Sequence, residues 1–321
     1  MIIADSKGSD QLQAALDFNH ARTKALLSQI QNFMNADRDK LLSFNDVKEI
    51  LRPRNQVYRG MQVIPINKII GSEGRYRDFT KYFLPRSEHL RIRWERIDIA
   101  NLRDIPLPPI SIYEIGGAYF VRDGNHRVSV ARSQGAEAID AEVTSLSTEI
   151  AINPSMTVDD LREAVISYEK KIFYDNTFFG DLTDDWELDF TQPGRYDVIY
   201  NYILVHKYFL NQEMKEELPF GDALVSWYNK VYLPINEIIE NDNIYADFPG
   251  RKPGDLYVWI VKHWDYLKKE NGLDYPAEDA ARDFSEKFGK ARGGFLSGKI
   301  SRLIQVFRAG LSGRKRRRKK G

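Results

Sequence analysis

The stretch from Tyr119 to Gly135 reads YFVRDGNHRVSVARSQG and decides how the first half of the chain folds. The apolar run Ala118–Val121 predicts a strand, and the spacing from about His126 to Gln134 predicts a helix. Gly124 allows the tight turn that must join them, and Gly135 stands where a left-handed cap ends a helix. The stretch therefore predicts a strand, a turn and a helix in immediate succession.

The turn between this strand and this helix has the chemistry of an anion site. The first amides of a helix are unpaired donors with a partial positive charge, and a glycine lets a ligand come close to them. An arginine can grip a phosphate with two parallel hydrogen bonds. We predict a phosphate ester as ligand, bound by Gly124, Asn125, His126 and Arg127, with Arg122 and Arg132 raising the positive potential. Plain structural roles are the alternatives: a turn glycine, a hydrogen-bonded histidine, or an Arg127 paired with a carboxylate.

The surrounding sequence predicts a small sheet with a helix in front of it. Gly116-Gly117 between two apolar runs is a strong hairpin signal. Proline residues at 106, 108 and 109 break the chain before that hairpin. The predicted elements are strands at Met61–Ile66, Ile110–Ile115, Ala118–Val121 and Ile139–Val143, and a helix at Arg91–Leu102.

The stretch from about Tyr58 to Val143 resembles the ParB/sulfiredoxin superfamily. Val63–Arg75 (VIPINKIIGSEGR) is similar to the first conserved box of ParB N-terminal domains, and Phe120–Arg127 (FVRDGNHR) resembles the box that cradles nucleotide phosphates. Ala138–Val143 (AIDAEV) matches the final strand. The resemblance implies a small mixed α/β domain that binds a nucleoside triphosphate, CTP or ATP, or the phosphates of a nucleic acid.

The resemblance also supplies a second wall for the site. Arg75 occupies the family's arginine position, and Arg77 follows it on the same side of an extended chain. If the protein is an enzyme, Mg²⁺ would accompany the nucleotide, and Glu73 would hold the metal or act as general base. Asp123 and His126 are the other catalytic candidates, His126 as a proton shuttle. The plain alternative for Glu73 is a solvated loop carboxylate.

Sulfiredoxin chemistry itself is excluded, because it needs a cysteine inside this loop and the chain has none. Asn125 stands near that position. ParB partition proteins carry a DNA-binding helix-turn-helix domain and a dimerisation domain after this region. The sequence after Val143 does not show that pattern, so a role in chromosome partitioning in the strict sense is not predicted.

The second half predicts a mainly helical domain. Residues 175–272 resemble an uncharacterised helical domain found in bacterial proteins that also carry a ParB-like front half. The motifs that carry this resemblance are TQPGRY at 191–196, DFPGR at 247–251 and DLYVWI at 255–260. Its Trp and Tyr residues fall at helical spacing, which favours a core over a ligand stack. No metal site is predicted. Helices are expected from Thr157 to about Phe173, at Arg195–Leu210, at Asp222–Ile239 with a break at Pro234, from Pro253 to near Gly272, and at about 277–289 and 297–309.

The N-terminal region predicts two helices. An amphipathic helix is expected over about 10–35, and a second begins at a capping box of Ser43 and Asp46 and ends at Leu51. The first would form a dimer seam or pack on its own domain, and packing is favoured. Its apolar stripe is Leu12, Leu16, Thr23, Leu27, Ile30 and Met34. The fold class is thus α+β, with N-terminal helices at 1–56, the ParB/sulfiredoxin-like domain at 57–147, a helical domain at 148–275, and C-terminal helices with a basic tail at 276–321.

The net charge of +1 conceals an uneven distribution. Seven consecutive basic residues stand near the end of the chain; without them, 40 of the 47 Lys and Arg remain against 46 Asp and Glu, so the body carries −6. Such a run predicts non-specific binding to nucleic acid or to an anionic membrane, with a solubilising tail as the alternative. The run is Arg314, Lys315, Arg316, Arg317, Arg318, Lys319 and Lys320.

Composition adds two expectations about the class of protein. No apolar run approaches the ~20 residues of a membrane span, and the first residues do not read as a signal peptide. With the missing cysteines, this predicts a cytoplasmic protein. We expect a bacterial ParB-like transcriptional regulator that binds a nucleotide through the 123–127 turn and DNA through its tail. The alternatives are a Mg²⁺-dependent phosphotransferase, NTPase or nuclease, and an interaction protein without a ligand; a homodimer also stays open.

Overall fold

The computed structural model describes residues 3–31, 39–212, 214, 216–272 and 275–289. By their contacts, the residues divide into two compact units, Met1–Val165 and Ile166–Gly321, which are described separately. The predicted helix at 297–309, the basic run at 314–320 and Met34 lie outside the described residues.

Unit 1 contains a six-stranded mixed sheet with the strand order β1-β3-β5-β4-β6-β2. The pairs β1–β3, β3–β5 and β4–β6 are parallel, whereas β4–β5 and β2–β6 are antiparallel. A mixed α/β unit is therefore confirmed. The strands are β1 (Leu42–Ser43), β2 (Gln56–Pro65), β3 (Ile69–Ser72), β4 (Ile110–Ile115), β5 (Ala118–Asp123) and β6 (Ala138–Leu146).

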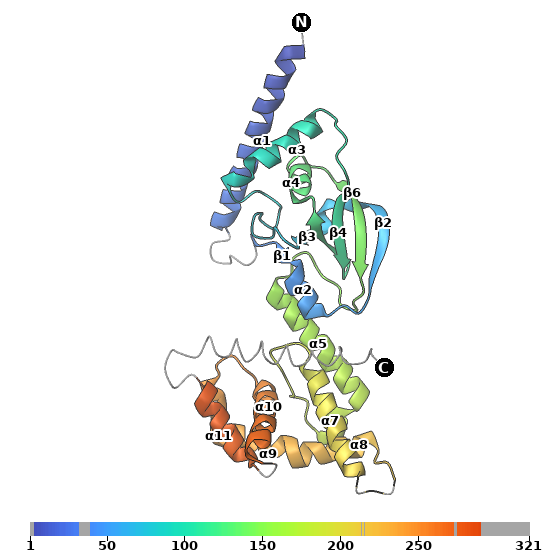
Figure 1. The fold of residues 1–321 in the computed structure, drawn as a ribbon, viewed down its shortest axis with the longest axis vertical. Coiled ribbons are helices and arrows are strands. Elements are labelled where there is room, and N and C mark those ends of the chain that lie inside the picture. The colour runs from blue at the N-terminus through green and yellow to red at the C-terminus, as the bar shows by residue number, and fades with distance from the viewer. Residues whose placement is uncertain (1–2, 32–38, 213, 215, 273–274, 290–321) are drawn as a thin grey trace, which may run out of the picture. The chain divides into compact units, whose positions relative to one another are not determined.

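Helices cover both faces of this sheet, because its central strands direct apolar side chains to both faces. Figure 1 shows α1, α3 and α4 gathered together, apart from α2. Trp94 and Val128 pack on one face, with Phe18 of α1, while Phe44 and Leu161 pack on the other. The helices are α1 (Ile3–Gln31), α2 (Phe44–Leu51), α3 (Arg91–Leu102), α4 (Asn125–Ser133) and the first part of α5 (Val158–Thr177).

The N-terminal helix is confirmed, but its predicted buried face is wrong. Helix α1 begins at Ile3 and not near residue 10. It packs on unit 1 through Ala14, Phe18, Ala21 and Ala25, all at most 1% exposed, while the predicted leucine and isoleucine stripe faces solvent. The small alanines let α1 approach α3 closely, and the larger leucines would hold the two helices apart.

The short strand β3, which is absent from the predicted set, positions the site. β3 runs parallel to β5, with Ser72 opposite Val121. Because parallel strands end at the same edge of a sheet, the loop after β3 and the turn after β5 lie next to each other. The predicted hairpin is confirmed: Ile115 pairs with Ala118, and Gly116 and Gly117 have φ of 60° and 80°.

Unit 2 is helical in every regular element that the structure describes. The predicted break near Pro234 is present one turn earlier, as a π-helical turn over Tyr228–Tyr232. Proline has no N–H to donate to the carbonyl four residues before it, and the wider turn accommodates that loss. The helices are the rest of α5, α6 (Phe179–Thr183), α7 (Arg195–Asn211), α8 (Phe220–Trp227), α9 (Leu233–Asn241), α10 (Pro253–Asn271) and α11 (Ala277–Phe288).

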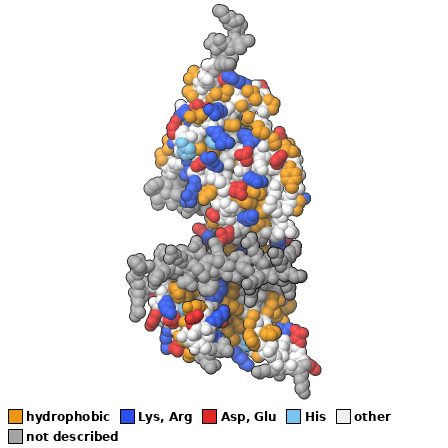
Figure 2. Space-filling view, in the orientation of Figure 1, with side chains coloured by type: hydrophobic (Ala, Val, Ile, Leu, Met, Phe, Trp, Pro, Cys, Tyr) orange, Lys and Arg blue, Asp and Glu red, His pale blue; other side chains and the backbone are white. Residues whose placement is uncertain are grey.

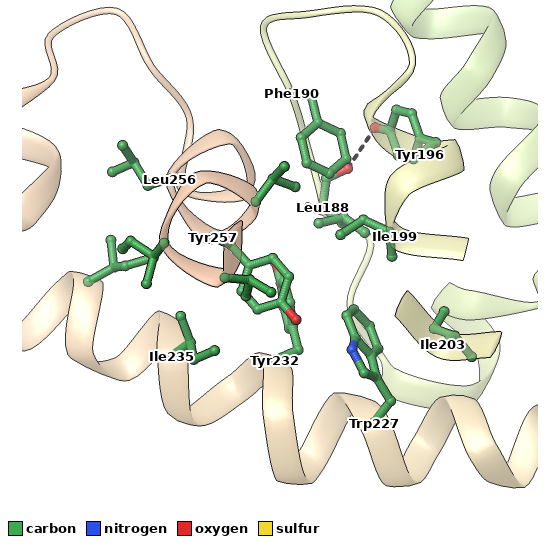
Figure 3. Close-up of a cluster of buried hydrophobic side chains, with 14 of the residues drawn as sticks. Leu188, Phe190, Tyr196, Ile199, Ile203, Trp227, Tyr232, Ile235, Leu256 and Tyr257 are labelled. Atoms are coloured by element: carbon green, nitrogen blue, oxygen red, sulfur yellow. Dashed lines mark hydrogen bonds between the residues drawn. The ribbon is translucent and has the colours of Figure 1, made fainter. Parts of the chain in front are cut away.

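Many aromatic residues of unit 2 form its core, as their spacing predicts, whereas Phe178, Tyr208 and Phe209 are more than half exposed. Trp227 and Tyr257 are nearly fully buried and meet edge to face, with ring centroids 5.9 Å apart. The hydroxyl of Tyr196 donates to the carbonyl of Leu188 at 2.7 Å (Figure 3). These rings are therefore engaged in packing and do not form a stacking platform for a ligand. None of the described helices has the length and apolar character needed to cross a membrane.

Candidate anion-binding site

A pocket of about 240 Å³ lies where the loop after β3, the turn after β5 and helix α3 meet. Its walls are built mostly from arginines and from the first turn of α4. The lining residues are Gly74, Arg75, Arg93, Ile97, Arg122, Asp123, Gly124, Asn125, His126 and Arg127. The structure thus brings the whole predicted 122–127 segment together with Arg75.

Gly124 gives this pocket its shape. Its φ of 104° lies in the left-handed region, and α4 begins at the next residue. A Cβ added to Gly124 would stand 2.5 Å from Cγ2 of Ile110, so any other residue there would clash as well as strain the backbone. The amides of the first turn of α4 have no carbonyl partner within the helix, which makes this end attractive to an anion.

Arg93 enters the pocket from α3 and has no counterpart in the sequence-based prediction. Its neighbour Trp94 is fully buried and donates its indole N–H to Oγ of Ser129 on α4 at 2.9 Å. This contact fixes α3 against α4 and places Arg93 beside the turn. No local pattern marks Arg93, because only tertiary packing brings α3 to the site.

Arg127 is held firmly within the turn. Its guanidinium donates to Oδ2 of Asp123 at 2.6 Å and to the carbonyl of Pro109 at 2.7 Å, and it also bonds the carbonyl of Pro108. Arg127 therefore pairs with a carboxylate, which is the plain structural role given above as the alternative to phosphate binding. Arg127 lines the pocket and also holds the turn in its conformation. Its removal would therefore change both the charge of the pocket and the conformation of the turn.

The second predicted wall is present only in part. Arg75 lines the pocket and pairs with Asp78 at 2.9 Å. Arg77 is exposed, lies over the ring of Tyr76 and is not among the lining residues. Glu73 is half-buried, donates its backbone N–H to the carbonyl of Val121, and is also absent from the lining.

Arg132, which was expected to raise the positive potential of this site, is not among the residues that line the pocket. It donates to the carbonyls of Lys81, Ile66 and Ile69 and lies over the ring of Phe83. Burial lowers the pKa of Arg132 to about 10. Its role is to join α4 to the chain around β3.

Two buried polar side chains of the pocket have atoms without a partner. Asn125 and His126 are 7% and 6% exposed, and neither Oδ1 of Asn125 nor Nδ1 of His126 makes a hydrogen bond. Buried polar atoms are nearly always bonded in folded proteins, so these two require a partner, an ordered water or a ligand, beyond the described side chains. Burial, and then the nearby Arg93 and Arg75, lower the pKa of His126 to about 4. The imidazole is therefore neutral near pH 7 and adds no positive charge.

The charge of the lining favours an anion. Four arginines (Arg75, Arg93, Arg122 and Arg127) stand against the single carboxylate of Asp123. Figure 2 shows Lys and Arg interspersed with Asp and Glu over the visible face of unit 1. One carboxylate that already pairs with an arginine is a poor set of ligands for Mg²⁺. Among the described residues, no group of three or more His, Asp or Glu is arranged to hold a metal ion.

Comparisons of the chain with protein-family models, with curated proteins and with solved structures find no match.

Proposed function

We propose that this protein is a ParB-like regulator whose unit 1 binds a phosphate-bearing ligand, a nucleoside triphosphate or a nucleic acid, at the start of α4. The observation that carries the proposal is the convergence of four arginines on a glycine turn with two unpartnered buried polar atoms, those of Asn125 and His126. Phosphate oxygens accept hydrogen bonds best from guanidinium groups and from the amides at the start of a helix.

The pocket suits the phosphate end of such a ligand. Its volume of about 240 Å³ is below the ~300–1,000 Å³ of sites that enclose a whole small molecule. The sugar and base of a nucleotide would therefore extend outside this pocket.

The basic run Arg314–Lys320 would add affinity for nucleic acid. Its support is its sequence alone, since it lies outside the described residues. Removal of residues 314–320 is expected to weaken binding to duplex DNA of any sequence and to flatten its dependence on salt. Equal DNA affinity of the full and shortened chains at all salt concentrations would remove the tail from the proposal.

Thermal unfolding with a panel of ligands tests the pocket assignment. CTP, ATP, GTP and inorganic triphosphate are each added to the wild-type chain, with the matching nucleosides as controls. At least one nucleotide is expected to raise the unfolding temperature more than triphosphate does, and the nucleosides are expected to have no effect. Failure of every nucleotide to stabilise the chain would contradict a nucleotide as the ligand of this pocket.

A further inference from the structure

Helix α1 carries a second apolar face, opposite the one that packs on unit 1. Leu12, Leu16, Leu27 and Ile30 are all more than half exposed, and together with Thr23 they form what we call the outer stripe. At 3.6 residues per turn, the outer stripe lies on the side of the helix away from the buried Ala14, Phe18, Ala21 and Ala25. The helix therefore packs on its own unit with one face and presents the other to solvent.

The exposed side of α1 is almost without charge. From Gly8 to Ile30, Lys24 is the one exposed residue with a permanent charge. Asp10 is half-buried and pairs with Arg103, and Arg22 donates to backbone carbonyls. A helix that faces water normally carries charged residues on that side, and depletion of charge is the mark of an interface core.

The exposed apolar residues of this side, with the half-exposed Leu26 beside the outer stripe, are placed symmetrically about Ala21. Leu12 and Ile30 stand nine residues before and after Ala21, and Leu16 and Leu26 stand five residues before and after it. If a second α1 lies antiparallel across the stripe, Leu12 of each copy meets Ile30 of the other, and Leu16 meets Leu26. A surface that matches itself in this way is what a two-fold dimer requires.

We propose that the outer stripe binds the outer stripe of a second copy of this chain, with the two α1 helices antiparallel about a two-fold axis at the level of Ala21. A lipid surface is a poorer occupant, because helices that lie on membranes carry Lys and Arg along their polar flank. Here the exposed flank of the stripe holds Gln13 and His20 with a single lysine, Lys24.

Sedimentation velocity on the full chain tests the proposal. The wild type is expected to sediment as a dimer of twice 37.2 kDa, and Leu16→Glu and Leu27→Glu are expected to sediment as monomers. Val205→Glu is the matched control: Val205 is an exposed aliphatic residue on α7 and is expected to leave the dimer intact. Circular dichroism and the unfolding temperature verify that each variant is folded. A wild-type chain that stays monomeric at high concentration, or a dimer that survives Leu16→Glu, would overturn the proposal.

Engineered thiols test the orientation, since the chain has no cysteine of its own. Leu12→Cys and Ile30→Cys chains of different tagged mass are mixed and oxidised. The antiparallel pair predicts a disulfide between the two different chains and little product from either variant alone. Efficient self-linking of Leu12→Cys would indicate a parallel pair and contradict the assigned geometry.

Discussion

The indole N–H of Trp94 and the hydroxyl oxygen of Ser129 form a hydrogen bond of 2.9 Å between two buried side chains. Trp94 belongs to α3, which supplies Arg93 to the pocket, and Ser129 belongs to α4, whose first turn is the pocket floor. One core contact therefore holds two walls of the candidate site in register.

Ser129→Ala is expected to destabilise unit 1. The indole N–H would remain buried without a partner, which costs about 1–3 kcal/mol. Urea unfolding measures this loss, with Ser133→Ala on the same helix as the control, since Ser133 is only half-buried. In a double-mutant cycle, Trp94→Phe is expected to cost less in the Ser129→Ala background than in the wild type. Strictly additive costs would show that the bond does not link the two helices.

Gly124→Ala is expected to be more damaging than Gly135→Ala. Both glycines have positive φ, 104° and 78°, so each substitution costs about 1–2 kcal/mol of backbone strain. Only Gly124 has no room for a Cβ, and overpacking against Ile110 adds about 1–3 kcal/mol. Free energies of unfolding from urea titrations compare the two variants. If both lose the same stability, the tight turn does not depend on this contact.

Asp98 is expected to make the protein less stable as the pH rises from about 4 to 6. Burial, and then the nearby Asp17 carboxylate, raise the pKa of Asp98 from 3.8 to about 6. The folded state therefore holds a proton that the unfolded state releases, and that contribution, at most about 3 kcal/mol, is present below pH 4 and lost by pH 6. Asp98→Asn should remove this decline. A variant whose stability follows the wild-type pH profile would show that Asp98 titrates normally.

His126 is expected to make the protein less stable as the pH falls from about 6.5 to 4, which is the opposite direction to that of Asp98. Its pKa in the folded state is about 4, below the 6.5 of an ordinary histidine, so the unfolded state takes up the proton first. Stability is therefore full above pH 6.5 and falls as the pH drops towards 4, by at most about 3 kcal/mol. His126→Asn should lack this fall, and urea titrations between pH 4 and 7 measure it. If the free energy of unfolding of the variant and of the wild type changes equally with pH, the low pKa of His126 is contradicted.

The sequence predicted those parts of the site whose signals are local. Three of these parts depend on residues adjacent in the chain: the DGNHR turn, the Gly116-Gly117 hairpin and helix α4. The structure shows all three. Arg93 was missed because a fold-level contact, that of Trp94 with Ser129, brings its helix to the turn. Arg132 was misplaced for the same kind of reason, since its three carbonyl partners are far away in the sequence.

Helix α1 shows a second limit of sequence periodicity. It carries two stripes at helical spacing, one rich in leucine and one rich in alanine around Phe18, and hydrophobicity alone favours the leucines. Close packing against α3 selects the smaller residues, and Phe18 meets Trp94 there at 5.6 Å between ring centroids. Short strands such as β1, with two residues, lack enough length to show a period at all.

Calorimetric titration of Arg93→Ala and Arg96→Ala tests the central claim most directly. Both arginines are exposed and lie on α3, but only Arg93 lines the pocket. The titrant is the nucleotide that most stabilises the wild type. Loss of a charge-assisted hydrogen bond, worth about 1.5–3 kcal/mol, predicts binding about 10- to 100-fold weaker for Arg93→Ala. Arg96→Ala should bind like the wild type. Wild-type affinity in Arg93→Ala, or an equal loss in Arg96→Ala, would contradict the assignment of the phosphate site to this pocket.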